Sequence, residues 1–279
     1  MIRFLAGSAI ALYLVPFARN LFARPKRLEA GDALEEKWGL GNEWRWFLGA
    51  ALVHLTWLGW AGWLQGLMPG TSMRIGLGTM AFVVVVTGLV LGSKPKMHVL
   101  KMILVIVGVV LLGVSQLAPM QQPPADYKNL WLPLHLGLIF IGIASFTVAF
   151  ALSVLYLAVR RRLKSQRLQG IVKLPSLAIL DQWNANSMVV GFVALTFGGL
   201  LGALWGESQA MEHESPDLTI YITVCLWIWY AVGLHTRVVV DWRGRVGAIF
   251  GVVGFAGFAL LVASAWLFFG AWHGFGVSQ

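Results

Sequence analysis

Charge and cysteine are both scarce in this sequence. Charged residues make up 12% of the 279 residues, hydrophobic residues make up 58%, and the mean hydropathy is +0.75. This apolar share is well above that of an ordinary soluble domain. Cys225 is the single cysteine, which excludes an intrachain disulfide and a cysteine-ligated zinc or iron–sulfur centre. Cys225 lies in an apolar run, and we expect it to be a small core residue. The composition predicts an all-α, polytopic integral membrane protein.

Acidic residues are also few, with 12 Asp and Glu against 21 Lys and Arg. None lies deep in an apolar run, where the coupling carboxylates of ion-driven transporters usually sit, so the sequence argues against a transporter. No arrangement of Ser, His and acid supports hydrolytic catalysis. In a membrane chain, the basic excess reports orientation and contact with anionic lipid. We therefore expect anionic lipid at the basic surfaces and no nucleic acid.

Eight apolar segments are long enough to cross a hydrocarbon core, which needs roughly 20 residues. They cover residues 2–21, 46–67, 75–91, 99–118, 132–159, 188–205, 218–240 and 246–269. Most Lys and Arg residues fall in the first, third, fifth and seventh connections. The positive-inside rule makes this face cytoplasmic and places both termini outside. No connection is long enough for a soluble domain, so we expect one multi-pass domain, residues 1–279, in the inner (cytoplasmic) membrane.

The depths of the six histidines are more informative than their number. His54 follows Arg45 by nine residues, which puts it roughly 13 Å inside the cytoplasmic boundary, and His235 lies roughly 8 Å inside the same boundary at 1.5 Å rise per residue. These two histidines are predicted to lie at similar height in the inner leaflet. A second pair is predicted outside, with His135 at the outer mouth of the fifth span and His273 just beyond the eighth.

Two histidines at one depth on separate helices, with aromatic neighbours such as Trp57 and Trp229, are what bis-imidazole ligation of a b-type haem requires. A second interpretation is that buried histidines hydrogen-bond across helices and that interfacial histidines sit in the headgroup zone. Most of the 14 tryptophans near span boundaries fit an aromatic belt. The inner tryptophans fit either a flat cofactor or ordinary packing. The residues alone leave both interpretations open.

Short runs in the second half of the chain occur in an order that resembles a known family. The strongest run is Leu234, His235, Thr236 and Arg237, followed by Trp242, Arg243, Gly244 and Arg245. The other runs are Leu134 to Leu136, Ser153 to Tyr156, Leu174 to Leu177, the set Gly191, Phe192, Leu195, Thr196, Gly198, Gly202 and Trp205, the pair Gly254 and Phe255, and the set Gly270, Trp272, His273 and Gly274. Over residues 132–274 this order is similar to the cytochrome c assembly proteins of the CcsA type, including the eight-span HemX-like members.

The resemblance implies a set of haem ligands and partners. It implies that His135 and His273 flank an outward-facing haem site. It also implies that His235 holds haem b within the membrane, and His54 matches best as its partner. The four histidines would serve as axial ligands of haem iron. Haem itself, other cytochrome c assembly proteins and apocytochrome c are the partners implied.

One connection departs from the family pattern. Haem-presenting members carry a tryptophan-rich WWD segment between the sixth and seventh spans, whereas residues 206–217 here hold no tryptophan. We therefore expect a haem-handling protein, closest to the HemX-like branch, rather than a complete haem–cytochrome c ligase or another enzyme. It would hold or deliver haem between the membrane site and the outer site. The alternative is a membrane regulator or scaffold that binds an enzyme of haem synthesis through a basic face containing Arg160, Arg161 and Arg162.

Overall fold

All regular structure in the described part of the chain is α-helical. A computed structural model describes residues 2–22, 40–65, 72–94, 96–118, 131–166, 174–208 and 218–267. The helices are α1 (Ile2–Phe22), α2 (Leu40–Gln65), α3 (Met73–Gly92), α4 (His98–Leu117), α5 (Trp131–Lys164), α6 (Leu177–Ser208), α7 (Leu218–Val239) and α8 (Arg245–Leu267). The predicted all-α fold class is confirmed.

Six of these helices, α3 to α8, are long and apolar enough to cross a membrane. A chain with this many apolar helices is a multi-pass membrane protein. The first two helices have 21 and 26 residues, which is enough length to span. That α1 and α2 also cross the membrane, which would make eight spans, and that both termini lie outside, stay predictions.

Helix α6 begins well before the predicted start of its span at residue 188. Its first turns carry Asp181, Gln182, Asn184 and Asn186, and these polar residues interrupt the apolar run that the sequence prediction followed. Ser176 precedes the helix, and its hydroxyl accepts a hydrogen bond from the Ile179 N–H at 3.3 Å, as an N-cap does. Asp181 and Asn184 are accommodated in these turns because their side chains bind residues of neighbouring helices, whereas Gln182 and Asn186 are exposed and bind each other.

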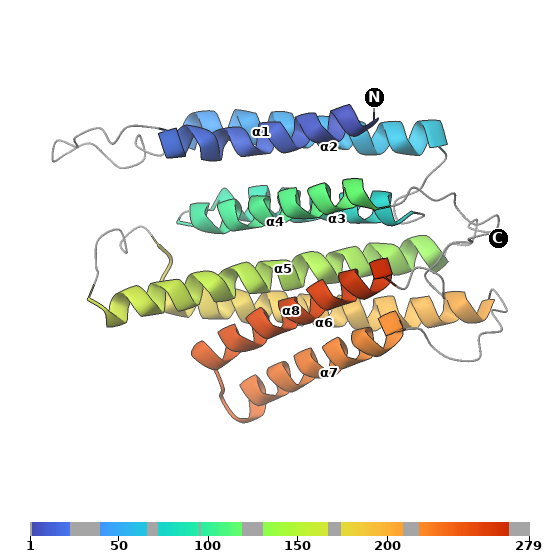
Figure 1. Cartoon of the computed structure of the whole chain (residues 1–279). Helices are drawn as coiled ribbons and strands as arrows, with labels where there is room; N and C mark the ends of the chain where they lie inside the picture. Colours follow the sequence, from blue (N-terminus) through green and yellow to red (C-terminus); the bar gives the residue numbers. More distant parts are fainter. Residues whose placement is uncertain are drawn as a thin grey trace.

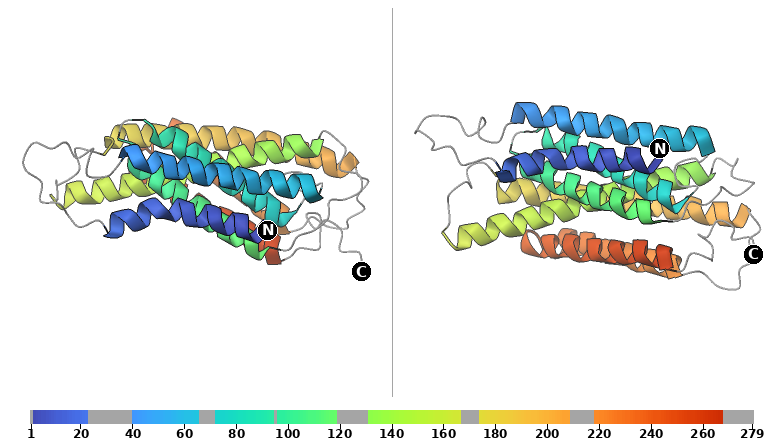
Figure 2. Two further views of the ribbon diagram at one scale, coloured as in Figure 1. Left: turned by 90° about the horizontal axis from the view of Figure 1, so that it is seen from above. Right: turned by 45° about the horizontal axis from the view of Figure 1, so that its top comes forward.

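The helices form an elongated bundle of antiparallel pairs (Figure 1). Helices α1 and α2 lie side by side, as do α3 and α4, then α5 and α6, and finally α7 and α8, and the views in Figure 2 show the same pairing. Helix α5 packs on α3, α4, α6 and α8, so it joins the two halves of the bundle. Helix α2 packs on α1 and α3, whereas α7 packs on α6 and α8.

The two ends of the bundle differ in charge. The described cations near the start of α1 and α3 are Arg3 and Arg74. The ends of α1, α3, α5 and α7 and the starts of α2, α4 and α8 carry a larger set: Arg19, Arg45, Lys94, Lys96, Lys101, Arg160, Arg161, Arg162, Lys164, Arg237, Arg243 and Arg245. We call the second end the basic end and the first the opposite end. Alternation of helix direction brings helix ends that are far apart in the sequence to the same end of the bundle (Figure 1).

Candidate functional site

His135 is held at the opposite end of the bundle by the last turns of α6. The imidazole Nδ1 lies 2.7 Å from the carbonyl oxygen of Gly198. The ring also lies against Gly202, where an added Cβ would be 2.7 Å from both its Cε1 and its Nδ1. Only a residue without a side chain leaves room for the ring at this approach. The two glycines therefore set both the position and the orientation of His135.

The contact with Gly198 also decides the tautomer of the neutral ring. A carbonyl oxygen can only accept, so Nδ1 carries the proton and the lone pair lies on Nε2. A histidine that ligates a metal through one nitrogen commonly donates the other N–H to a carbonyl in this way. The donor chemistry of His135 thus fits an iron ligand. Its predicted partner, His273, lies outside the described residues.

His54 is fully buried and links three helices in the other half of the bundle. Its Nε2 lies 3.1 Å from the carbonyl oxygen of Gly78 on α3, and its Nδ1 lies 3.5 Å from the Tyr13 hydroxyl on α1. The rings of Tyr13, Trp57 and Phe82 surround it, with centroids 6.1, 5.8 and 5.3 Å away. Both ring nitrogens therefore face protein partners, which suits a residue that joins α1, α2 and α3.

His235 points out of the bundle from the last turns of α7. Its side chain is exposed and makes no hydrogen bond to any described residue. Leu226, Tyr230 and Gly233, which are buried against α6 and α8, lie on the other side of the same helix. The face of α7 that carries His235 is therefore the face that points away from the rest of the chain.

The structure does not bring His54 and His235 together. Helix α2 lies at one side of the bundle and α7 at the other, with the α3–α4 and α5–α6 pairs between them (Figure 1). Spacing along a span fixes the height of a residue but not the side of the bundle on which its helix lies. The expected approach of these two histidines is therefore not found. Their individual roles as ligands stay predictions.

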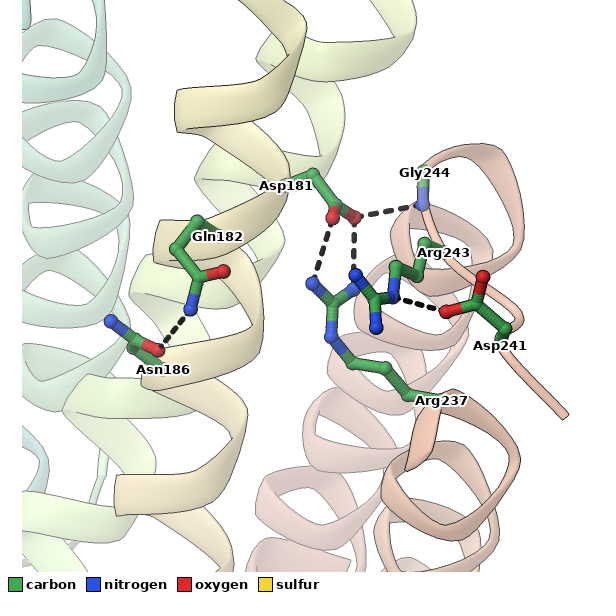
Figure 3. Close-up of polar contacts among 7 residues, drawn as sticks. All are labelled: Asp181, Gln182, Asn186, Arg237, Asp241, Arg243 and Gly244. Carbon is green, nitrogen blue, oxygen red and sulfur yellow. Dashed lines mark hydrogen bonds and ion pairs between the residues drawn. The ribbon is translucent and has the colours of Figure 1, made fainter. Parts of the chain in front are cut away.

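Two residues after His235, Arg237 points inward and forms an ion pair with Asp181 on α6. Figure 3 shows the two side chains facing each other, with Arg237 Nη1 3.0 Å from Asp181 Oδ1 and Nη2 2.7 Å from Oδ2. The N–H of Gly244 donates to Asp181 Oδ1 at 2.8 Å. Gly244 has φ +66°, a left-handed conformation that favours glycine. One carboxylate thus ties α6 to both α7 and the turn before α8.

The sequence prediction missed this ion pair. It interpreted the basic residues, Arg237 among them, through orientation and contact with anionic lipid. The sequence does contain an arginine and an aspartate near span boundaries. These two side chains can form two parallel hydrogen bonds, an arrangement that suits partly buried contacts between helices. In the same turn, Arg243 contacts Asp241 in a second ion pair that is exposed to the surroundings (Figure 3).

A buried polar group lies between α5, α6 and α8, next to the ion pair. The Asn184 amide donates to the carbonyl oxygen of Ala149 at 2.9 Å and also contacts the Ser153 hydroxyl. Ser153 donates to the same carbonyl at 2.7 Å. Gly251 of α8 lies over this group, and a Cβ there would be 2.2 Å from Ser153 Oγ. Two of the polar residues at the start of α6, Asp181 and Asn184, therefore cross-link helices inside the bundle.

Tyr230 of α7 packs against Gly254 of α8, about one helical turn after Gly251. Its ring stacks on Phe146 of α5 with centroids 3.7 Å apart, and Gly254 makes room for its hydroxyl, which would lie 2.4 Å from an added Cβ. This buried hydroxyl has no hydrogen-bond partner within the described ranges.

The predicted core position of Cys225, also on α7, is wrong. Its side chain is exposed, because the apolar run around it faces outward as well as inward.

Acidic, cysteine and histidine side chains do not gather into metal-binding groups of three or more anywhere in the described residues. Haem needs only two axial ligands from the protein, so the histidines are the residues that could hold it. Together, the apolar helices, their buried polar cross-links and the histidines at the bundle surface define a helical, multi-pass membrane protein.

Comparison with known proteins places the chain in a family. The family described as Cytochrome C assembly protein matches residues 75–268, which is more than half of the chain. The protein belongs to the cytochrome c assembly protein family, and the expected resemblance is confirmed. The match runs from α3 to α8, so it includes His135 and His235 and excludes His54.

Curated relatives carry the same assignment. The chain is similar to proteins named "Cytochrome c biogenesis protein CcsA": it is 30% identical over 149 residues to that of Synechococcus sp. (strain CC9902), covering 46% of this chain and 49% of the relative. It is 29% identical over 134 residues to that of Chlamydomonas reinhardtii, covering 47% of this chain and 36% of the relative. The chain thus matches about half the length of these relatives or less.

Proposed function

We propose that this protein binds haem and hands it on during cytochrome c assembly, in the inner membrane of the cell. Haem is the cargo, and its iron would be held by histidine imidazoles at two places. The outer place is at the opposite end of the bundle, with His135 and His273 as ligands. The inner place is near the basic end, with His235 as a ligand.

The orientation of His135 carries this proposal. The Gly198 carbonyl holds the proton on Nδ1, so the lone pair on Nε2 can bind iron without a change of tautomer. Gly202 admits the ring in this position, because an added Cβ there would lie 2.7 Å from its Cε1 and Nδ1. Membership of the cytochrome c assembly family gives this geometry its functional context.

For the inner place, His54 stays the predicted partner of His235 only as a sequence hypothesis. The hydrogen bonds of His54 to Gly78 and Tyr13 favour a role in joining helices instead. His235 lies in the strongest run shared with the family and, unlike His54, inside the matched residues. His235 is therefore the better candidate for an iron ligand in the membrane.

Absorption spectroscopy of the purified protein tests the proposal. After expression with ample haem, the protein in detergent is expected to show a Soret band and a reduced-minus-oxidised difference typical of a bis-histidine b-type haem. His135→Ala should remove a large part of this absorbance. His98→Ala, a change of a histidine at the start of α4, is the matched control and should leave the spectrum unchanged.

Two results would contradict haem handling. The first is wild-type protein that folds, as judged by cooperative thermal unfolding, but carries no haem absorbance. The second is equal haem content in the wild type, His135→Ala and His235→Ala.

A second candidate function is docking of a soluble enzyme of haem synthesis at the basic end. It is favoured by the end of α5, where Arg161, Arg162 and Lys164 are exposed. These cations also suit contact with anionic lipid. Two measurements separate these roles. A specific partner in a pull-down from detergent extract that is lost when the three cations are changed to Gln supports docking. Weaker retention of the same variant on anionic-lipid vesicles, with no such partner found, supports the lipid role.

A further inference from the structure

Two exposed amide side chains interrupt the apolar outer surface of α6. Gln182 Nε2 donates to Asn186 Oδ1 at 2.9 Å, and Figure 3 shows this pair on the side of α6 turned away from Arg237. Among the exposed side chains of α6 that the structure describes, these two alone are polar. The exposed side chains that follow on this surface are apolar: Val189, Val190, Val193 and Phe197.

The amide pair keeps hydrogen-bonding groups that need a further partner. After the bond between them, Asn186 retains both of its N–H groups, and Gln182 retains one N–H and its carbonyl oxygen. Neither side chain makes another hydrogen bond to a described residue. Over Leu177–Leu204, α6 is long and apolar enough to cross a membrane, and an exposed face of such a helix meets lipid, where an unpartnered amide is unfavourable. Three N–H donors beside one acceptor suit a ligand rich in oxygen acceptors.

A lysine and a tryptophan lie next to the amides, toward the basic end. Lys94 follows α3, and its Nζ lies 5.8 Å from the centre of the Trp183 ring on α6, which is a cation–π contact. The turn that presents Lys94 is held by its N–H, which donates to Leu91 O at 3.2 Å, and by its carbonyl, which accepts from the Met97 N–H at 3.1 Å. Lys94 is exposed and forms no ion pair with a described acidic residue. Its ammonium group can therefore bind an anion beside the indole.

These side chains follow the order in which a phospholipid presents its polar groups. Trp183 and Asn186 are three residues apart, so they project within about 60° of each other, and Asn186 lies roughly 4.5 Å deeper at 1.5 Å rise per residue. In a phospholipid, the ester carbonyls lie below the phosphate, on the side of the acyl chains. A phosphate at Lys94 thus places the carbonyls at the level of the amides, and the apolar surface beyond Asn186 faces the acyl chains.

We propose that Lys94, Gln182, Trp183 and Asn186 form a binding site, which we call the amide–lysine site, for one phospholipid of net negative charge. Lys94 pairs with the phosphate, and the amides donate hydrogen bonds to the ester carbonyls. Lys94 and the nearby exposed Lys96 repel the ammonium group of a zwitterionic headgroup and so favour an anionic one.

A polar side chain on a helix of another protein would also satisfy the two amides. It would leave the cation above them without a counter-charge, whereas an anionic phospholipid accounts for both features. The amide–lysine site is separate from the cations at the end of α5, and it does not depend on haem binding.

Lipid titration of the purified, delipidated protein in detergent tests the site. The probes are phosphatidylglycerol with ester-linked chains, phosphatidylglycerol with ether-linked chains and phosphatidylethanolamine with ester-linked chains. Native mass spectrometry gives the fraction of protein that holds one lipid, and the rise in unfolding temperature with lipid gives a second measure of affinity. The variants are Lys94→Gln and the double variant Gln182→Leu with Asn186→Leu. Lys96→Gln, a change of an exposed lysine in the same turn, is the matched control.

The wild type is expected to bind ester-linked phosphatidylglycerol several-fold more tightly than either other probe. Lys94→Gln should lower this affinity several-fold and remove the preference over phosphatidylethanolamine, whereas Lys94→Arg should retain both. The double leucine variant should lose the preference for ester over ether linkage, because ether lipids lack the carbonyl acceptors. Lys96→Gln should match the wild type. Cooperative unfolding without lipid shows that each variant folds.

Three results would overturn the amide–lysine site. Equal affinity of the wild type for the ester and ether lipids removes the role of the amides, and this comparison needs no variant to fold. Equal losses in Lys94→Gln and Lys96→Gln mean a general attraction of lipid to the basic end. A dimer or a co-purifying protein that is lost in the double leucine variant, with lipid binding unchanged, assigns the amides to contact with another helix.

Discussion

Asp181 and Arg237 face each other across the contact between α6 and α7 in a two-pronged ion pair, at 3.0 and 2.7 Å. Their side chains are only 16% and 14% exposed, so little solvent screens the pair. The Gly244 N–H bound to the same carboxylate adds the turn before α8 to this junction. The junction holds the α7–α8 hairpin, and with it His235, against α6.

Asp181→Asn should destabilise the folded protein by on the order of 2 kcal/mol, because a largely buried arginine side chain loses its charged partner. Thermal unfolding in detergent measures the change. Asp241→Asn is the matched control, since its ion pair with Arg243 is 74% and 64% exposed and exposed pairs contribute roughly 0–1 kcal/mol. Asn also tolerates the positive φ of Asp241. Equal losses for the two variants would show that the buried junction is not special.

The start of α6 shows why hydropathy predicted the fold class but misplaced one helix. Apolar runs long enough to span revealed the helices, because every backbone polar group in a bilayer must be satisfied within a helix. The same criterion rejected residues 177–187, where Asp181 and Asn184 lie. Their partners, Arg237 and Ser153, come from α7 and α5. A hydropathy count along one segment contains no information about partners on other helices.

Gly251→Ala should destabilise the bundle by about 1–3 kcal/mol, as overpacking does. The added methyl would lie 2.2 Å from Ser153 Oγ and 3.2 Å from the Ala149 carbonyl oxygen. Gly199→Ala is the control, because nothing lies within 4 Å of its Cβ position and alanine favours helix by up to about 1 kcal/mol. Thermal unfolding should separate the two variants in opposite directions. Ser153→Ala combined with Gly251→Ala should recover part of the loss.

Tyr230→Phe should leave stability unchanged or raise it by about 1 kcal/mol, because it removes a buried hydroxyl that forms no hydrogen bond to a described residue. Tyr13→Phe, which removes the hydroxyl beside His54 Nδ1, should cost about 0.6 kcal/mol, the mean value of such bonds in membranes. The comparison is made by thermal unfolding of both variants. A marked loss in Tyr230→Phe would mean that its hydroxyl has a partner, such as a buried water molecule.

The histidines show a second limit of sequence reasoning. Counting residues from a boundary gives depth, and depth placed His54 and His235 at similar height. Which helices are neighbours depends on side-chain packing between segments distant in sequence, such as Phe146 on Tyr230. The family resemblance seen in residues 132–274 overlaps the region that the family matches, residues 75–268. Its strongest run contained Arg237. The direction of His235 required the structure, because it follows from the partner of Arg237 on α6.

Gly202→Ala is the sharpest test of the outer haem site that leaves its histidine in place. The new methyl would lie 2.7 Å from the Cε1 and Nδ1 atoms of His135, so the ring must turn and the 2.7 Å contact with Gly198 must lengthen. If that contact sets the tautomer that binds iron, haem content at the outer site should fall about 10-fold or more, the range typical of lost outer-shell partners. Gly199→Ala is the matched control on the same helix and should keep full haem absorbance. Normal haem content in Gly202→Ala, with unchanged thermal unfolding, would mean that His135 does not need this orientation and that the outer site is held by other residues.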